Sequence, residues 1–128
     1  MKLLASLLVF TVLTHQSFAA DHFTDWFTQF RISTAKSDAK AISAGVKFPI
    51  PWENGKIRDI KSPEDFTQNF SRYFTPEITK IVATMKPERL PTGTYSITWK
   101  ARGNEYSIYF KPGPEKTFIL DGLSEGPP

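Results

Sequence analysis

The stretch YSITWKARGNEYSIYFK, residues 95–111, decides the fold class of this 128-residue chain. Apolar residues alternate with polar ones on both sides of a turn at Arg102-Gly103-Asn104, and a period of two is typical of half-buried strands. A second turn at Pro112-Gly113-Pro114 precedes an apolar run over residues 117–123. The stretch and its continuation therefore predict a three-stranded antiparallel meander with one apolar face.

Two helices are predicted immediately before this meander. Ser62-Pro63-Glu64-Asp65 combines a capping serine, a proline suited to the first helical position, and acids that favour the positive end of the helix dipole. Thr75-Pro76-Glu77 repeats the start signal, and apolar residues continue at helical spacing until Pro87. We therefore expect two consecutive helices with a kink between them.

The N-terminal half predicts two helices followed by a hairpin. Asp38 can cap a short second helix, and the longer first helix, over residues 21–36, is predicted by aromatic residues at helical spacing: Phe23, Trp26, Phe27 and Phe30. Residues 47–52, KFPIPW, contain two prolines and favour an edge strand or an extended arm. The Asn54-Gly55 pair then predicts a tight turn into a strand at residues 57–60.

The first 19 residues predict a signal peptide. Lys2 supplies a positive start, residues 3–13 are apolar, and Ser17-Phe18-Ala19 matches the small-x-small pattern before a cleavage site. The apolar run is too short to span a bilayer, so we expect a periplasmic or secreted protein without a membrane anchor after cleavage. The remaining length suits one core, which gives a single domain at 20–123 and a disordered tail at 124–128.

Composition excludes several functional classes. The chain has no cysteine, and His22 is the one histidine after residue 19, so we predict no metal and no cofactor. The net charge is only +3 and basic residues are interspersed with acids, which argues against a nucleic-acid partner. The tightest basic groups have acidic neighbours, and we interpret them as solvated surface, with an anion site as the alternative. They are Lys36 with Lys40, and Lys56 with Arg58 and Lys61.

The order of elements and three motifs resemble the nuclear transport factor 2-like superfamily. The motifs are Phe23 to Phe30 followed by Asp38, then Lys47-Phe48-Pro49-Ile50, and Ser62-Pro63-Glu64-Asp65-Phe66 running through Tyr73-Phe74-Thr75-Pro76-Glu77-Ile78. The resemblance covers residues 23–120 and implies an α+β fold in which a cone-like curved antiparallel sheet packs on N-terminal helices. It also implies a pocket at the open end of the cone and dimerisation through the open sheet face. That scaffold serves enzymes, ligand binders and inhibitors alike, so it does not choose a function.

Aromatic residues form the candidate ligand site. Five of them are predicted to line an apolar pocket in the cone: Trp26, Phe30, Tyr73, Trp99 and Tyr106. The alternative is that they pack the first helix against the sheet. Trp52 follows Phe-Pro-Ile-Pro beside the Asn-Gly turn, so we expect it on an exposed arm, where it would mark a partner surface.

The sequence shows no complete catalytic set. His22 lies close to the new N-terminus and is expected to face solvent, and Asp25 lies off the aromatic stripe, which favours a surface carboxylate. We therefore expect a non-enzymatic exported domain that binds a small apolar molecule in the cone, a protein partner or a second copy. Two alternatives stay open: an isomerase- or dehydratase-like enzyme with an inward acid and a tyrosine, and an immunity or inhibitor protein.

Overall fold

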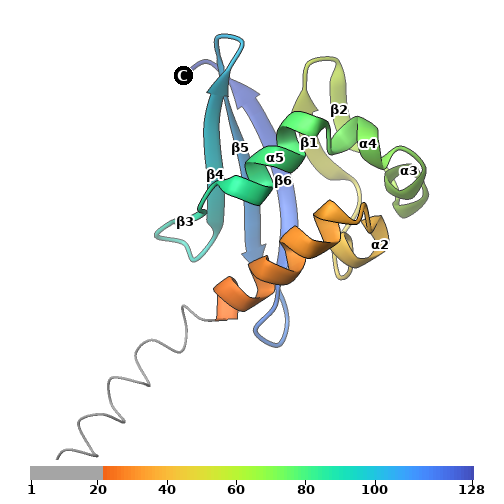
Figure 1. Ribbon diagram of the computed structural model, residues 1–128, viewed down its shortest axis with the longest axis vertical. Coiled ribbons are helices and arrows are strands. Elements are labelled where there is room, and N and C mark those ends of the chain that lie inside the picture. The colour runs from red at the N-terminus through yellow and green to blue at the C-terminus, as the bar shows by residue number, and fades with distance from the viewer. Residues whose placement is uncertain (1–21) are drawn as a thin grey trace, which may run out of the picture.

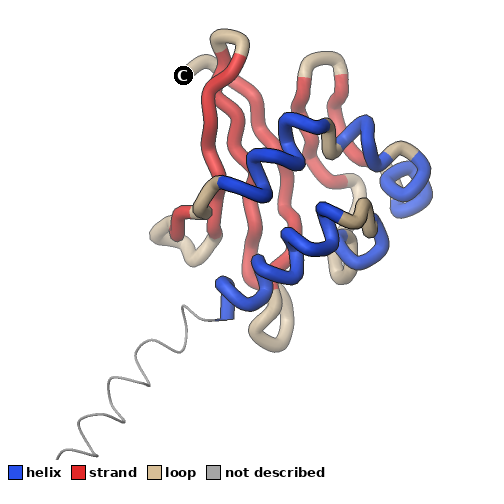
Figure 2. The backbone as a smooth tube through the Cα atoms, in the orientation of Figure 1, coloured by secondary structure: helices blue, strands red, loops and turns tan. Residues whose placement is uncertain are grey.

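The computed structural model describes residues 22–128, and the predicted signal peptide lies outside the described residues. An N-terminal helix over residues 22–35 begins the described part. The other elements follow as α2 (Ala39–Ile42), β1 (Ile50–Asn54), β2 (Ile57–Ile60), α3 (Pro63–Gln68), α4 (Phe70–Tyr73), α5 (Pro76–Thr84), β3 (Glu88–Arg89), β4 (Tyr95–Ala101), β5 (Asn104–Pro112) and β6 (Phe118–Gly126). The N-terminal helix and α5 cross the same face of a six-stranded sheet, which confirms the predicted α+β class (Figure 1, Figure 2). Within residues 22–128, no helix is long and apolar enough to cross a membrane.

The sheet has the strand order β2-β1-β6-β5-β4-β3. Strands β4, β5 and β6 pair antiparallel in chain order, which confirms the predicted meander. Strands β1 and β2 form the predicted antiparallel hairpin. Strand β1 also runs parallel to β6, with Trp52 opposite Leu123, so the sheet is mixed rather than wholly antiparallel as expected.

Strand β1 lies inside the sheet, so the prediction of an edge strand or free arm at residues 47–52 is wrong. Two prolines favoured an edge, because proline has no N–H to donate to a neighbouring strand. The structure places Pro51 at an irregularity, where the register between β1 and β2 shifts between Ile50 and Glu53. The missing N–H therefore falls at a gap in the hydrogen-bond ladder, and β1 can have a neighbour on both sides.

Side-chain caps begin the helices where the sequence predicts them. Ser62 Oγ accepts a hydrogen bond from the Asp65 N–H at 3.1 Å, and Thr75 Oγ1 accepts one from the Ile78 N–H at 3.3 Å. A proline occupies the first turn in both helices. The first of the two predicted helices is interrupted at Asn69, so α3 and α4 together occupy the place of one expected helix.

Aromatic side chains fill the layer between the N-terminal helix and the sheet. Phe23, Phe27 and Phe30 are buried, and their ring centroids lie 6.2, 5.5 and 5.0 Å from that of Phe110 on β5. Burial of each such ring contributes about 2 kcal/mol before the cost of chain entropy. The predicted packing of the aromatic helix on the strands is therefore confirmed.

The last strand is longer than the sequence predicts. Strand β6 continues to Gly126, and residues 124–126 pair with residues 105–107 of β5. The Glu125 carboxylate accepts hydrogen bonds from the Tyr106 hydroxyl at 2.5 Å and from the Gly55 N–H at 2.9 Å. The prediction of a disordered tail from residue 124 is therefore wrong for the first three of its residues, because long-range partners hold them.

Candidate functional site

The five aromatic residues predicted to line one pocket lie in three separate places. Trp26 and Phe30 stack on each other, with ring centroids 5.3 Å apart. Trp99 and Tyr106 stack on each other across β4 and β5, at 5.5 Å, and Tyr73 lies on α4. Four of the five are buried and Trp26 is partly buried. These positions match the alternative, in which the rings pack helices against the sheet, and a role in ligand binding stays a prediction for them.

Trp52 does not mark an exposed partner surface, because its side chain is 0% exposed. Strand β1 carries it between β2 and β6, and its ring stacks on Phe74 with centroids 5.3 Å apart. Alternation along β1 buries Ile50 and Trp52 and exposes Pro51. The prediction was wrong because it treated the two prolines as a sign of an arm that leaves the sheet.

A different set of residues forms a groove between the N-terminal helix and the segment that joins α5 to β4. We call it the aromatic groove; its volume is about 670 Å³. Its lining residues are Phe23, Thr24, Phe27, Thr28, Arg31, Thr84, Lys86, Pro87, Arg89 and Tyr95. Its volume exceeds that of a hollow beside β2, about 410 Å³, and that of a hollow between α2 and α3, about 390 Å³.

Three aromatic rings border this groove: Tyr95 is partly buried, and Phe23 and Phe27 are only 5% and 4% exposed, so the latter two present their edges. Phe23 stacks on Tyr95 of β4 with ring centroids 3.6 Å apart, and Phe27 stacks on Phe23 at 5.5 Å. The spacing of four residues places Phe23 and Phe27 on one face of the N-terminal helix. Tyr95 pairs with Arg89 of β3, which brings the β3 edge of the sheet against that helix face. The three rings are therefore held by tertiary contacts and form a preformed apolar wall.

Three cationic side chains and no acidic one line the groove: Arg31, Lys86 and Arg89. The Arg31 guanidinium lies over the Phe27 ring, 4.6 Å from its centroid. Its Nε donates to the Val82 carbonyl at 2.8 Å and its Nη2 donates to the Met85 carbonyl at 2.7 Å. Arg31 thereby satisfies carbonyls at the C-terminal end of α5 and is fixed in place, while Lys86 and Arg89 are exposed at the rim.

Sequence reasoning missed this groove because its residues come from separate parts of the chain. Phe23 and Phe27 were expected in the core. No role was predicted for the three cations that line the groove. One signal was present, since Arg31 follows Phe27 by four residues and shares its helix face. Nothing in the sequence places Tyr95 beside them.

One acid–tyrosine pair of the kind expected for an isomerase is present, but outside the groove. The Tyr73 hydroxyl donates to Asp65 Oδ2 at 2.5 Å, and Asp65 also accepts from the Lys61 N–H and the Asn69 amide. The hydrogen bond from Tyr73 is the main cause that lowers the pKa of Asp65. The pKa of Tyr73 is raised to about 12, mainly by burial and next by its hydrogen bond to Asp65. Asp65 is therefore a weak base and Tyr73 a weak acid near neutral pH, so the pair acts as a structural link.

Two further acids are also committed to protein partners. Arg102 binds both oxygens of Glu77 at 2.8 and 3.0 Å, and this contact is the main cause that lowers the pKa of Glu77. The hydrogen bond from Tyr106 is the main cause that lowers the pKa of Glu125. Asp25 is exposed, as expected. The lowered pKa values of Glu77 and Glu125 are the opposite of what suits a general base near neutral pH.

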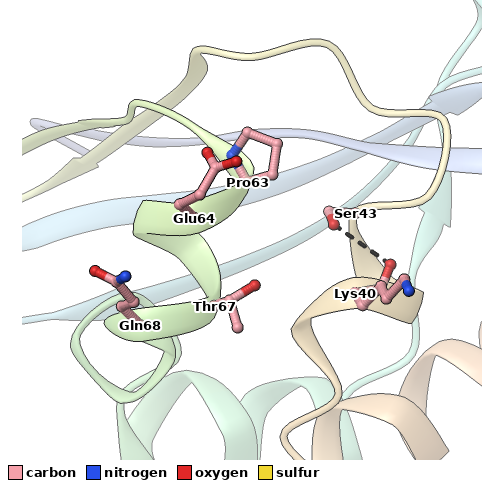
Figure 3. A pocket seen from close by; sticks show the side chains of 6 residues that line it. All are labelled: Lys40, Ser43, Pro63, Glu64, Thr67 and Gln68. Carbon is pink, nitrogen blue, oxygen red and sulfur yellow. Dashed lines mark hydrogen bonds between the residues drawn. The ribbon is translucent and has the colours of Figure 1, made fainter.

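A smaller hollow of about 390 Å³ lies between α2 and α3 (Figure 3). Its lining residues are Lys40, Ser43, Pro63, Glu64, Thr67 and Gln68. The Ser43 hydroxyl donates to the Lys40 carbonyl at 3.4 Å, so the hydroxyl serves the local helix end rather than a base. In the part of the chain from residue 22 onward, no group of three or more His, Cys, Asp or Glu side chains could hold a metal ion.

Comparison with known proteins identifies no relative. No family model, no curated protein and no solved structure matches the chain.

Proposed function

We propose that this chain is an exported, non-enzymatic binding domain that takes a small apolar molecule with one anionic head group in the aromatic groove. The observation that carries the proposal is the combination of three aromatic rings with three cations and no acid in one hollow of about 670 Å³. Volumes of this order are typical of small-molecule sites. Carboxylates of medium-chain fatty acids have the required chemistry.

The two parts of the groove would recognise the two parts of such a ligand. The Tyr95 ring and the exposed edges of Phe23 and Phe27 offer apolar surface, and each 100 Å² that a ligand covers contributes about 2.5 kcal/mol before the cost of association. Lys86 and Arg89 are exposed, so each adds about 0.5 kcal/mol to the binding of a carboxylate. Affinity would therefore come mainly from the rings, and the preference for an anion from the rim.

The proposed function is non-enzymatic because the acid–tyrosine pair lies outside the aromatic groove. Asp65 and Tyr73, the nearest match to an inward acid with a tyrosine, line a different hollow and have pKa shifts opposite to those that catalysis needs. No arrangement among residues 22–128 favours the inhibitor or immunity alternative specifically. Binding is therefore the function that the arrangement supports best.

We also propose that the chain is a member of the nuclear transport factor 2-like superfamily. The order of its elements supports this: an aromatic helix, a short helix, a hairpin, further helices and a meander. The sheet is open in Figure 1, so a cone-like curl stays a prediction, as does dimerisation through the sheet face opposite the helices. Export rests on the signal sequence at residues 1–19.

Calorimetric titration of the purified protein with decanoate and decanol tests the proposed site. We expect saturable binding of decanoate and weaker binding of decanol. The double variant Lys86→Gln with Arg89→Gln should weaken decanoate binding roughly three- to tenfold and leave decanol binding unchanged, because only the head-group contacts are lost.

Lys80→Gln is the matched control, since Lys80 is exposed on α5 and does not line the groove. It should bind decanoate as the wild type does. The proposal is overturned if decanoate does not saturate the protein, or if the double variant binds it as tightly as the wild type.

A further inference from the structure

A second hollow, of about 410 Å³, lies beside the edge strand β2. We call it the cationic hollow. Its lining residues are Lys56, Ile57, Arg58, Asp59, Lys61, Asp65, Arg72 and Tyr73. Four of these side chains are cationic and two are acidic, so the hollow has an excess of positive charge.

Two separate segments contribute these cations. Lys56, Arg58 and Lys61 follow the hairpin turn, where the sequence favours solvated surface and leaves an anion site as the alternative. Arg72 comes from α4 and joins them only through the packing of α4 near β2 (Figure 1). Arg72 therefore adds a fourth cation from a second element to the three that flank or lie on β2.

None of the four cations forms a salt bridge with the described residues, although the charges of Arg72 and Asp65 interact. Among residues 22–128, the ion pairs are Arg102 with Glu77 and Lys111 with Asp121, and neither involves this hollow. Arg58 Nη1 donates to the carbonyls of Gly55 and Ile57, at 2.6 and 2.8 Å, which holds its guanidinium against the turn. Its other nitrogens make no further hydrogen bond to the described part of the chain.

Arg72 differs from the arginines that have a structural role. Arg31 and Arg102 each direct two guanidinium nitrogens at protein acceptors. The Arg72 guanidinium has no hydrogen bond or ion pair to the residues that the structure describes, and its side chain is exposed in the hollow. Its five N–H donors are therefore available to a ligand.

The two acids in the hollow leave the positive excess in place. Both oxygens of Asp65 are occupied: Oδ2 accepts from Tyr73 and from the Lys61 N–H, and Oδ1 accepts from Asn69. Asp59 is exposed on β2. A ligand would therefore meet a fixed carboxylate that is already hydrogen-bonded, beside an Arg72 guanidinium that has no hydrogen bond to the described residues.

We propose that the cationic hollow binds a small molecule bearing a phosphate or sulfate group. Guanidinium groups match tetrahedral oxyanions with paired hydrogen bonds, which assigns Arg58 and Arg72 to the oxyanion, while Lys56 and Lys61 add charge. A hollow of about 410 Å³ accommodates a group as large as a sugar phosphate. The site is separate from the aromatic groove, which lies at the β3 edge, and does not depend on it.

Amide NMR titration of the purified protein tests this site, with inorganic phosphate, glucose 6-phosphate and glucose as probes at constant ionic strength. We expect both phosphates to shift the amides of residues 55–61 and 70–74, and glucose to shift none of them. Tighter binding of glucose 6-phosphate would assign the hollow to a phosphorylated molecule, and equal binding would assign it to the free ion; both results support the site.

Arg72→Gln should weaken phosphate binding at least fivefold, because it removes the cation with no structural partner. Lys36→Gln, at an exposed lysine outside the hollow, should bind as the wild type does. A dispersed amide spectrum of each variant establishes that it is folded. The proposal is overturned if phosphate shifts the amides of surface lysines throughout the protein, or if Arg72→Gln binds phosphate as tightly as the wild type does. It is also overturned if glucose produces the same amide shifts.

Discussion

Single side chains link parts of this fold that are distant in sequence. Arg31 connects the N-terminal helix to the carbonyls at the end of α5, and Glu125 connects β6 to the hairpin turn and to Tyr106. The structural role of Arg31 and of Glu125 is not visible in the sequence, because each is one charged residue among many. Its partners, not its type, give it a structural role.

Tyr73→Phe tests the link between Asp65 and α4. At pH 7 we expect a loss of about 1.5 kcal/mol in the free energy of unfolding, because a hydrogen bond to a charged acceptor is removed. The folded-state pKa of Asp65 is lowered, so its contribution is present above the unfolded pKa near 3.8 and is lost as the pH falls through the folded value. The pKa of Tyr73 is raised from 10.0 to about 12, so its contribution is present below pH 10 and is lost as the pH rises toward 12.

The difference between wild type and Tyr73→Phe should therefore be largest from about pH 4 to pH 10 and shrink on both sides. Urea denaturation at acid, neutral and alkaline pH measures it. Tyr109→Phe is the control, since the Tyr109 hydroxyl has only a 3.5 Å contact with Ser124. If the difference in the free energy of unfolding between wild type and Tyr73→Phe stayed constant with pH, the contact between Tyr73 and Asp65 would contribute nothing to stability.

At the scale of elements, β6 is the strand that joins the hairpin to the meander. Gly122 lies where β6 meets β1, with a φ of +152°, and a Cβ at this position would lie 2.7 Å from the Pro51 carbonyl oxygen. We expect Gly122→Ala to lower the free energy of unfolding by about 2 kcal/mol or more, because the backbones of two strands would have to separate.

Gly126→Ala is the matched control on the same strand, because a Cβ there would meet nothing within 4 Å. Its effect should stay below about 0.5 kcal/mol. Urea denaturation of both variants measures the difference. Equal midpoints would show that the close approach of β1 and β6 does not limit stability.

The elements were largely predictable, because their signals are local. The caps at Ser62 and Thr75 and the alternation along β4 and β5 act within a few residues of where they stand. The neighbours of β1 were not predictable in this way. Whether a strand with two prolines lies at an edge depends on which strand pairs beside it, and that strand is β6, about seventy residues later in the chain.

At the scale of the whole molecule, the two proposed sites lie at opposite edges of the sheet. The aromatic groove is next to β3 and the cationic hollow is next to β2. Five strand spacings separate these edges, which is about 24 Å, more than twice the screening length of about 8 Å at physiological salt. The cations of one site therefore have little influence on the charge of a ligand at the other.

Export is a prediction about the whole chain. Protein recovered from the exported fraction should begin at Ala20, because Ser17-Phe18-Ala19 has the small side chains that signal peptidases accept. Intact mass measurement checks this, and Ala19→Arg should block processing. Recovery of the wild-type chain with Met1 in place from that fraction would contradict the signal-peptide prediction.

The sequence by itself determined the α+β class, the meander, the hairpin and the helix starts, because periodicity and capping depend on neighbours within one or two turns. It also indicated that the aromatic stripe would be buried. Only the tertiary structure decided that Trp52 is enclosed, that Arg31 and Tyr95 share a groove, and that Arg72 joins the cations at and beside β2. Those arrangements depend on which faces pack together, and the packing of distant segments leaves no mark in the local pattern of residues.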